Sequence, residues 1–138
     1  MVKKIGGYEY LEEIATEETF IEIHQEAIKI GGAWHDGIRE KGSIYYMAEM
    51  FRNMIKRKED MVTMAAKLMT FIIKEHPFWD GNHRTAFETA QLILRAFGYE
   101  IKVDRKEAEK FIRSIDKPSI HENVVKEWIK NNMQPIQN

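Results

Sequence analysis

Nine consecutive residues of this chain bring together the side-chain types that move protons and hold phosphate. They read His76-Pro77-Phe78-Trp79-Asp80-Gly81-Asn82-His83-Arg84. Histidine accepts a proton from a hydroxyl at neutral pH, so His76 is a candidate general base. Asp80 offers the hard carboxylate oxygen that Mg²⁺ prefers. We therefore predict a site in which a base and a metal ligand lie close together.

The second half of the same stretch predicts a phosphate-binding turn at the start of a helix. The free N–H groups and the dipole of a helix N-terminus both favour an anion. Gly81 lets the backbone adopt positive φ and approach a ligand closely. A cation such as Arg84 in the first turn of a helix is unfavourable against the helix dipole unless a bound anion offsets it. We therefore predict that Arg84 grips the transferred phosphate and is a catalytic residue. The predicted nucleotide-binding residues of this turn are Gly81, Asn82, His83 and Arg84.

Each of these residues taken singly also has a purely structural explanation. His76 could cap a helix C-terminus, Asp80 could belong to a plain turn, and Arg84 could be a surface ion-pair partner. A zinc site is a further alternative, although the spacing matches no usual zinc pattern; it would use His35, His76, Asp80 and His83. The convergence of a base, an acid, a glycine and an arginine within nine residues favours the functional interpretation.

The elements around the motif are predicted to be helices. Apolar residues recur at helical spacing in 17–30, 43–57, 60–75 and 82–97, and the segment 31–42 between the first two is predicted to be a loop. Ser43 and Asp60 are the expected N-caps of the second and third helices, and Pro77 ends the third. Capping boxes at Asp104 and Ser119 precede two last helices, while 99–103 alternates like a short strand. The fold class is therefore an all-α, compact single-domain bundle over residues 1–138, with room for one short β-hairpin.

Composition excludes several classes of function. Twenty-one Lys and Arg balance 22 Asp and Glu, a formal charge of -1, so we expect no direct nucleic-acid binding. The chain has no cysteine, which excludes disulfides and thiolate chemistry. No signal peptide is recognisable, and the longest apolar stretch, 61–73, falls short of the ~20 residues that cross a membrane. A cytoplasmic protein without membrane contact is expected.

Residues 76–84 resemble the H-P-F-x-[D/E]-G-N-[G/K]-R signature of the Fic/Doc superfamily and depart from it only at His83. The resemblance implies a compact helical fold and a nucleoside triphosphate, such as ATP, as donor with Mg²⁺. It also implies a base that activates a Ser, Thr or Tyr hydroxyl of a target protein, a metal ligand, two phosphate-binding residues and a buried anchor. These roles fall, in that order, on His76, Asp80, Asn82 with Arg84, and Phe78.

Two branches of the superfamily differ in the group they transfer. Fic-type members mostly transfer AMP and carry a second arginine where this chain has Phe87. Doc-type members continue N-K-R-T-A-[L/F], which His83-Arg84-Thr85-Ala86-Phe87 resembles. They also carry a G-[I/L]-R-x-x-G loop like residues 37–42, in which Arg39 could contact nucleotide or target. The likeness spans about 8–128 and favours the Doc branch.

Doc-type proteins are toxins that transfer the γ-phosphate to a threonine of a translation elongation factor. By resemblance we expect the same reaction here, on an elongation factor, together with a separately encoded antitoxin. Two alternatives stay open. One is an AMP or other nucleotidyl transferase, and the other is a catalytically silent nucleotide-binding module.

Overall fold

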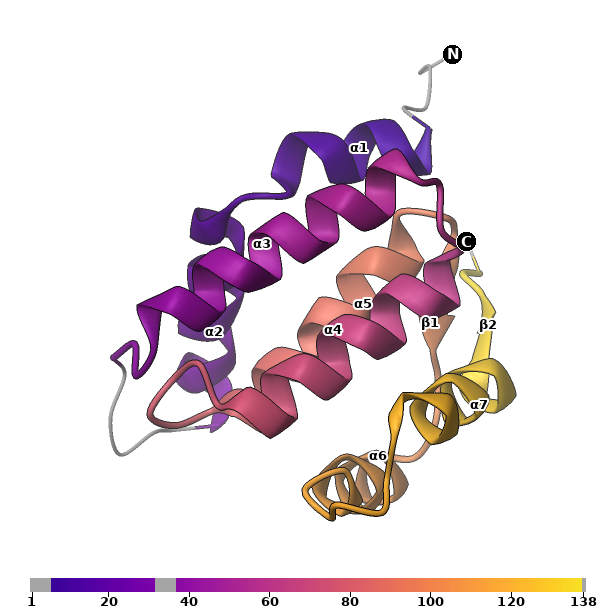
Figure 1. Ribbon diagram of the computed structural model, residues 1–138. Helices are drawn as coiled ribbons and strands as arrows, with labels where there is room; N and C mark the ends of the chain where they lie inside the picture. The colour runs from indigo at the N-terminus through magenta and orange to yellow at the C-terminus, as the bar shows by residue number, and fades with distance from the viewer. Residues whose placement is uncertain (1–5, 32–36, 138) are drawn as a thin grey trace.

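The computed structural model describes residues 6–31 and 37–137, and within these ranges it contains seven helices and one small sheet (Figure 1). The prediction of an all-α fold is confirmed. No helix in the described ranges is long and apolar enough to cross a membrane. The elements are α1 Gly7–Ile14, α2 Glu17–Gly31, α3 Lys41–Lys56, α4 Met61–Glu75, α5 Asn82–Arg95, β1 Tyr99–Ile101, α6 Arg105–Ser114, α7 Glu122–Asn132 and β2 Met133–Pro135.

Helix α4 is the centre of the molecule. It lies beside α5, with α1 and α3 on one side of this pair and α6, α7 and the strands on the other (Figure 1). Because apolar residues cover most of its circumference, α4 contacts α3, α5 and α7. Fully burying one such side chain contributes roughly 1.5–3 kcal/mol, so this helix is a major source of stability. Its buried residues are Val62, Met64, Ala65, Ala66, Leu68, Met69, Ile72 and Ile73.

Both ends of α4 have a local cause. At the start, the Asp60 carboxylate accepts from the Thr63 N–H (2.9 Å) and from the Thr63 hydroxyl (2.7 Å), as the sequence predicted. At the end, His76 adopts the left-handed conformation (φ 49°, ψ 62°) and Pro77 follows. The chain then turns back into α5, so the loop of residues 76–81 joins the two central helices.

Two predicted helix starts are wrong. Helix α3 begins at Lys41, with Glu40 rather than Ser43 as N-cap, because the Glu40 N–H is bound to the Pro77 carbonyl (3.0 Å) and fixes the chain there. Helix α7 begins after His121, which makes no side-chain cap bond, so Ser119 is not its cap.

Other boundaries differ less. Asp104 does cap α6, through the Lys106 N–H (3.1 Å). Helix α5 stops at Arg95, two residues before the predicted end. Helix α1 was not predicted; of its eight residues, Leu11 alone is buried.

The predicted strand is present, but its partner lies at the far end of the chain. Strand β1 pairs antiparallel with β2, and Ile101 lies opposite Met133. The buried Gln91 side chain of α5 accepts from the Ile101 N–H (2.8 Å) and donates to the Ile101 carbonyl (3.1 Å). Helices α6 and α7 lie between the two strands in the sequence. The pairing of the strands therefore holds this helix pair close to α5.

Candidate active site

His76 presents its imidazole to solvent at the end of α4. The side chain is exposed and has no hydrogen-bond partner in the described part of the chain. Its own backbone N–H bonds to the Ile72 carbonyl (3.1 Å), so the residue is a helix cap whose imidazole is accessible from solvent. A non-glycine residue in this left-handed region stores about 1 kcal/mol or more of strain, which the surrounding structure must offset.

The loop that follows is anchored by Phe78 and Asn82. Phe78 is 1% exposed, in agreement with the anchor role that the resemblance implied. The Asn82 side chain accepts from the Phe78 N–H (3.1 Å) and donates to the Phe78 carbonyl (2.9 Å). Asn82 was predicted to bind phosphate, but both polar groups of its side chain serve this loop. Its backbone N–H is the group left for a ligand.

His24 of α2 holds the same loop from the other side, and the sequence analysis missed it. Its ring stacks on Phe78 with centroids 3.8 Å apart and planes 3° from parallel. Nε2 donates to the Asp80 carbonyl (2.8 Å), and the residue is 1% exposed. A signal existed, because His24 stands on the apolar stripe of α2 between Phe20 and Ala27. A buried polar group there requires a partner.

The segment 37–40 pairs with the loop as a short antiparallel ribbon, which we call the flap. Ile38 and Phe78 form its bridge, and the N–H groups of Arg39 (2.8 Å) and Glu40 (3.0 Å) donate to the Pro77 carbonyl. The Arg39 guanidinium donates to the carbonyls of Glu75 (2.6 Å) and His76 (2.6 Å). Arg39, predicted to contact nucleotide or target, therefore caps the C-terminus of α4.

The zinc alternative depends partly on residues 32–36. His35 lies outside the described residues. Among the residues that the structure describes, no group of three or more His, Cys, Asp or Glu is placed to hold a metal ion.

Gly81 shapes the start of α5. It has φ +77°, and a Cβ at this position would lie 2.8 Å from Ile28 Cγ2, so the position requires glycine. Its N–H donates to Asp80 Oδ1 (2.8 Å), which orients that carboxylate. The N–H groups of the first three residues of α5 have no hydrogen-bond partner among the described residues. These residues are Asn82, His83 and Arg84.

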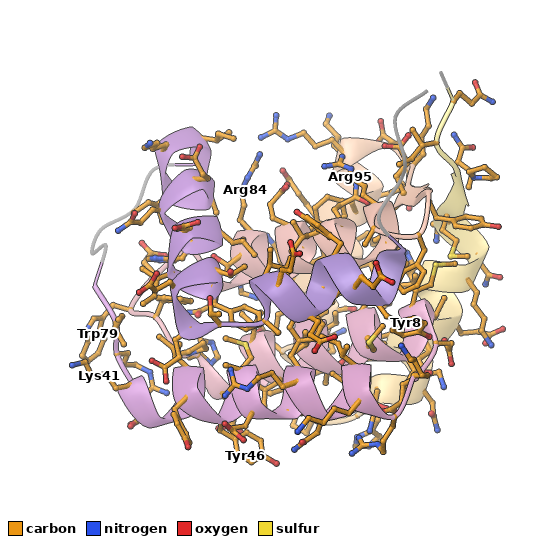
Figure 2. The ribbon with its side chains drawn as sticks, turned by 90° about the horizontal axis from the view of Figure 1, so that it is seen from above. Tyr8, Lys41, Tyr46, Trp79, Arg84 and Arg95 are labelled. Carbon is orange, nitrogen blue, oxygen red and sulfur yellow. The ribbon has the colours of Figure 1, made fainter. Side chains whose placement is uncertain are left out.

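Arg84 has no counter-charge among the residues that the structure describes. It makes no ion pair or hydrogen bond within the described ranges, and its Nε is buried without a partner. In Figure 2, Arg84 and Arg95 both extend from α5 away from Tyr46 on α3. Since Arg84 also stands in the first helical turn, its charge and the helix dipole add to one positive region.

His83 is held by an acid that the sequence analysis did not connect with the motif. Its Nε2 lies 2.9 and 3.0 Å from the two carboxylate oxygens of Asp116, in the turn between α6 and α7. Both side chains are partly exposed. No sequence signal links the two residues, because they are 33 positions apart.

The comparison with known proteins identifies the family. A model of the Fic/DOC family matches residues 14–94, which is more than half of the chain, and the chain belongs to this family. The match contains the flap and the whole stretch 76–84. Members of the family are typically transferases with a nucleotide donor, generally with Mg²⁺. No curated protein matches the chain.

Proposed function

We propose that this protein transfers the γ-phosphate of a nucleoside triphosphate, such as ATP, to a hydroxyl of a target protein. The proposal rests mainly on one observation: within residues 6–31 and 37–137, neither the charge of Arg84 nor the first three N–H groups of α5 have a partner. A buried guanidinium nitrogen without a partner is costly. A phosphate chain would satisfy both the guanidinium and the N–H groups through charge-assisted hydrogen bonds.

Side chains and backbone groups of this chain can provide the proton transfer and the phosphate contacts of the reaction. The acceptor hydroxyl gives its proton to the exposed His76 imidazole as its oxygen bonds to the γ-phosphorus. The bond from that phosphorus to the β–γ bridging oxygen breaks, and the nucleoside diphosphate leaves. Arg84 and the N–H groups of α5 stabilise the charge on the phosphate oxygens, so positioning and electrostatics provide most of the catalysis.

Asp80 fits the role of a Mg²⁺ ligand. The Gly81 N–H orients its carboxylate, and His24 holds its backbone carbonyl. One protein carboxylate together with phosphate oxygens and water is the usual surrounding of Mg²⁺ in nucleotide sites. When bound there, Mg²⁺ neutralises phosphate charge.

The choice of the γ-phosphate rests on Phe87. Its side chain is half-buried and packs against the core, at the position where AMP-transferring relatives carry a second arginine. One turn beyond Arg84, α5 therefore offers no cation for a second phosphate contact at this position. This supports the Doc-type reaction over nucleotidyl transfer.

We propose, on the same resemblance, that a translation elongation factor is the target and that a separately encoded antitoxin restrains the protein as a toxin. Growth arrest on expression, relieved by a neighbouring gene product, is the expected behaviour. Harmless overexpression without such a neighbour would contradict this part of the proposal and leave the chemistry to be judged separately.

Labelled nucleotide tests the chemistry. The protein is incubated with Mg²⁺, cell lysate and ATP labelled at either the α- or the γ-phosphate. We expect γ-label on a protein, whereas α-label would show nucleotidyl transfer and no label at all would favour a silent binding module. His76→Ala is the matched control, because the exposed imidazole has no packing role. Labelling that persists in this variant would refute His76 as the base.

A further inference from the structure

Asp116 places a negative charge at the phosphate end of α5. Its carboxylate oxygens are 2.9 and 3.0 Å from His83 Nε2. Since a carboxylate only accepts, Nε2 carries the hydrogen, and that donor is fully used. His83 is the second residue of α5, between Asn82 and Arg84, whose backbone N–H groups find no partner in the part of the chain that is described.

The carboxylate is held in this position by its backbone. Lys74, in the last turn of α4, donates to the carbonyls of Ile115 (3.0 Å) and Lys117 (3.1 Å), on either side of Asp116. Ile115 is completely buried, which fixes the turn to the core. Because the Lys74 ammonium serves these carbonyls, His83 is the ion-pair partner of Asp116 within the described ranges.

This arrangement changes what His83 can contribute. A lysine with no acid beside it would add a full positive charge to the phosphate site. The pair of His83 and Asp116 adds no net positive charge, because the carboxylate balances any charge on the ring. A phosphate oxygen can use the Nε2 donor only if it displaces Asp116, and like charges oppose that approach.

We propose that Asp116 is a specificity-determining residue of the phosphate site: it competes with the phosphate chain for His83 and lowers the affinity for the most highly charged nucleotides. The inference rests on the proposed function, because it concerns the nucleotide that this function requires. The penalty grows with the number of phosphate charges near α5. Asp116 therefore reduces the difference in affinity by which the site prefers a triphosphate to a diphosphate.

The test is Asp116→Asn, which keeps an oxygen that accepts from Nε2 and removes only the charge. Equilibrium binding is measured with Mg²⁺ and a non-hydrolysable ATP analogue, with ADP and with adenosine. We expect the variant to bind the triphosphate analogue about three- to tenfold more tightly, the range given by one unit charge at several ångströms in a partly solvated site. The gain for ADP should be smaller, and adenosine binding should not change.

Two further variants separate competition for His83 from simpler effects. Glu127→Gln removes one charge from an exposed carboxylate of α7 that makes no ion pair among the described residues, and it should leave all three affinities unchanged. In a His83→Ala background, Asp116→Asn should give a smaller gain than in the wild type, because the contested donor is absent while the repulsion between the carboxylate and phosphate remains.

Each result bears on a different claim. An unchanged or weaker affinity of Asp116→Asn for the triphosphate analogue would overturn the inference, as would a gain that persists undiminished without His83. If neither the wild type nor Asp116→Asn binds any nucleotide, the proposed function itself fails, and the inference fails with it. Nucleotide binding without the expected gain refutes the role of Asp116 alone.

Discussion

Gly81→Ala is the substitution whose cost the structure defines most directly. Two independent terms oppose the methyl group. The backbone has φ +77°, where an L-residue costs roughly 1–2 kcal/mol more than glycine. The new Cβ would also lie 2.8 Å from Ile28 Cγ2, well inside the normal carbon–carbon contact of about 3.5–4.0 Å.

The two terms can be added to a net magnitude. Relieving an overpacked contact of this kind costs typically ~1–3 kcal/mol. The loss of unfolded-chain freedom on replacing glycine returns about 0.4–1 kcal/mol. We therefore expect Gly81→Ala to lower the free energy of unfolding by about 1–4.6 kcal/mol. The middle of this range, ~3 kcal/mol, corresponds to a decrease in melting temperature of roughly 10 °C for a chain of this size. Thermal and urea unfolding followed by circular dichroism measure both quantities.

A second glycine provides the matched control. Gly98 has φ +87°, but a Cβ there would meet nothing within 4 Å. Gly98→Ala should therefore show the backbone term alone, about 1 kcal/mol. In an Ile28→Ala background, which removes the contacted methyl, Gly81→Ala should fall to a similar value. Equal costs at the two glycines, or no coupling to Ile28, would refute the assignment of a steric term.

Three further perturbations test the site and its scaffold. His76→Ala and His76→Gly should both abolish transfer. The glycine variant should be about 1 kcal/mol more stable than the alanine variant, because the backbone at this position is left-handed (φ 49°). Equal unfolding free energies of the two variants would show that the strain is absent. His24→Phe should retain the stacking on Phe78 and lose the bond to the Asp80 carbonyl, costing ~1–2 kcal/mol and raising the Mg²⁺ concentration needed for half-maximal transfer. An unaltered Mg²⁺ titration would remove His24 from its positioning role. Partial burial raises the pKa of Asp60, but the hydrogen bonds from Thr63, the charge of Lys126 and the Val62 N–H together hold the pKa below the ordinary 3.8. The contribution of this cap to stability is thus fully present above pH ~4 and is lost as the pH falls through the lower pKa of the folded state. The difference in unfolding free energy between wild type and Asp60→Ala, about 1 kcal/mol at neutral pH, should therefore disappear in acid. A difference that does not depend on pH would contradict this prediction.

Local signals in the sequence predicted the centre of the fold. The apolar stripe of α4, its Asp60 cap and its end at Pro77 all act within a few residues of one another. The same holds for the nine-residue stretch that joins α4 to α5. Such features are fixed by backbone geometry and periodicity, so they can be inferred without tertiary information.

Features that depend on distant contacts could not be predicted in this way. Ser43 satisfies the requirements of an N-cap, yet the pairing of Glu40 with Pro77 starts the helix earlier. The contact between His24 and Asp80 joins residues 56 positions apart, and only packing brings them together. The predicted roles of Asn82 and Arg39 also did not foresee their contacts within the fold. The Asn82 side chain is bonded to Phe78, and the Arg39 side chain is bonded to the His76 carbonyl.

The two hydrogen bonds of the Arg39 guanidinium link the flap directly to His76, the proposed general base. Arg39 Nε donates to the carbonyl of His76 itself, and Arg39 Nη2 donates to the carbonyl of Glu75. Any protein that draws the flap away from α4 must first break both bonds. The His76 peptide then loses this restraint, so a protein that displaced the flap would also release the backbone that sets the direction of the His76 imidazole.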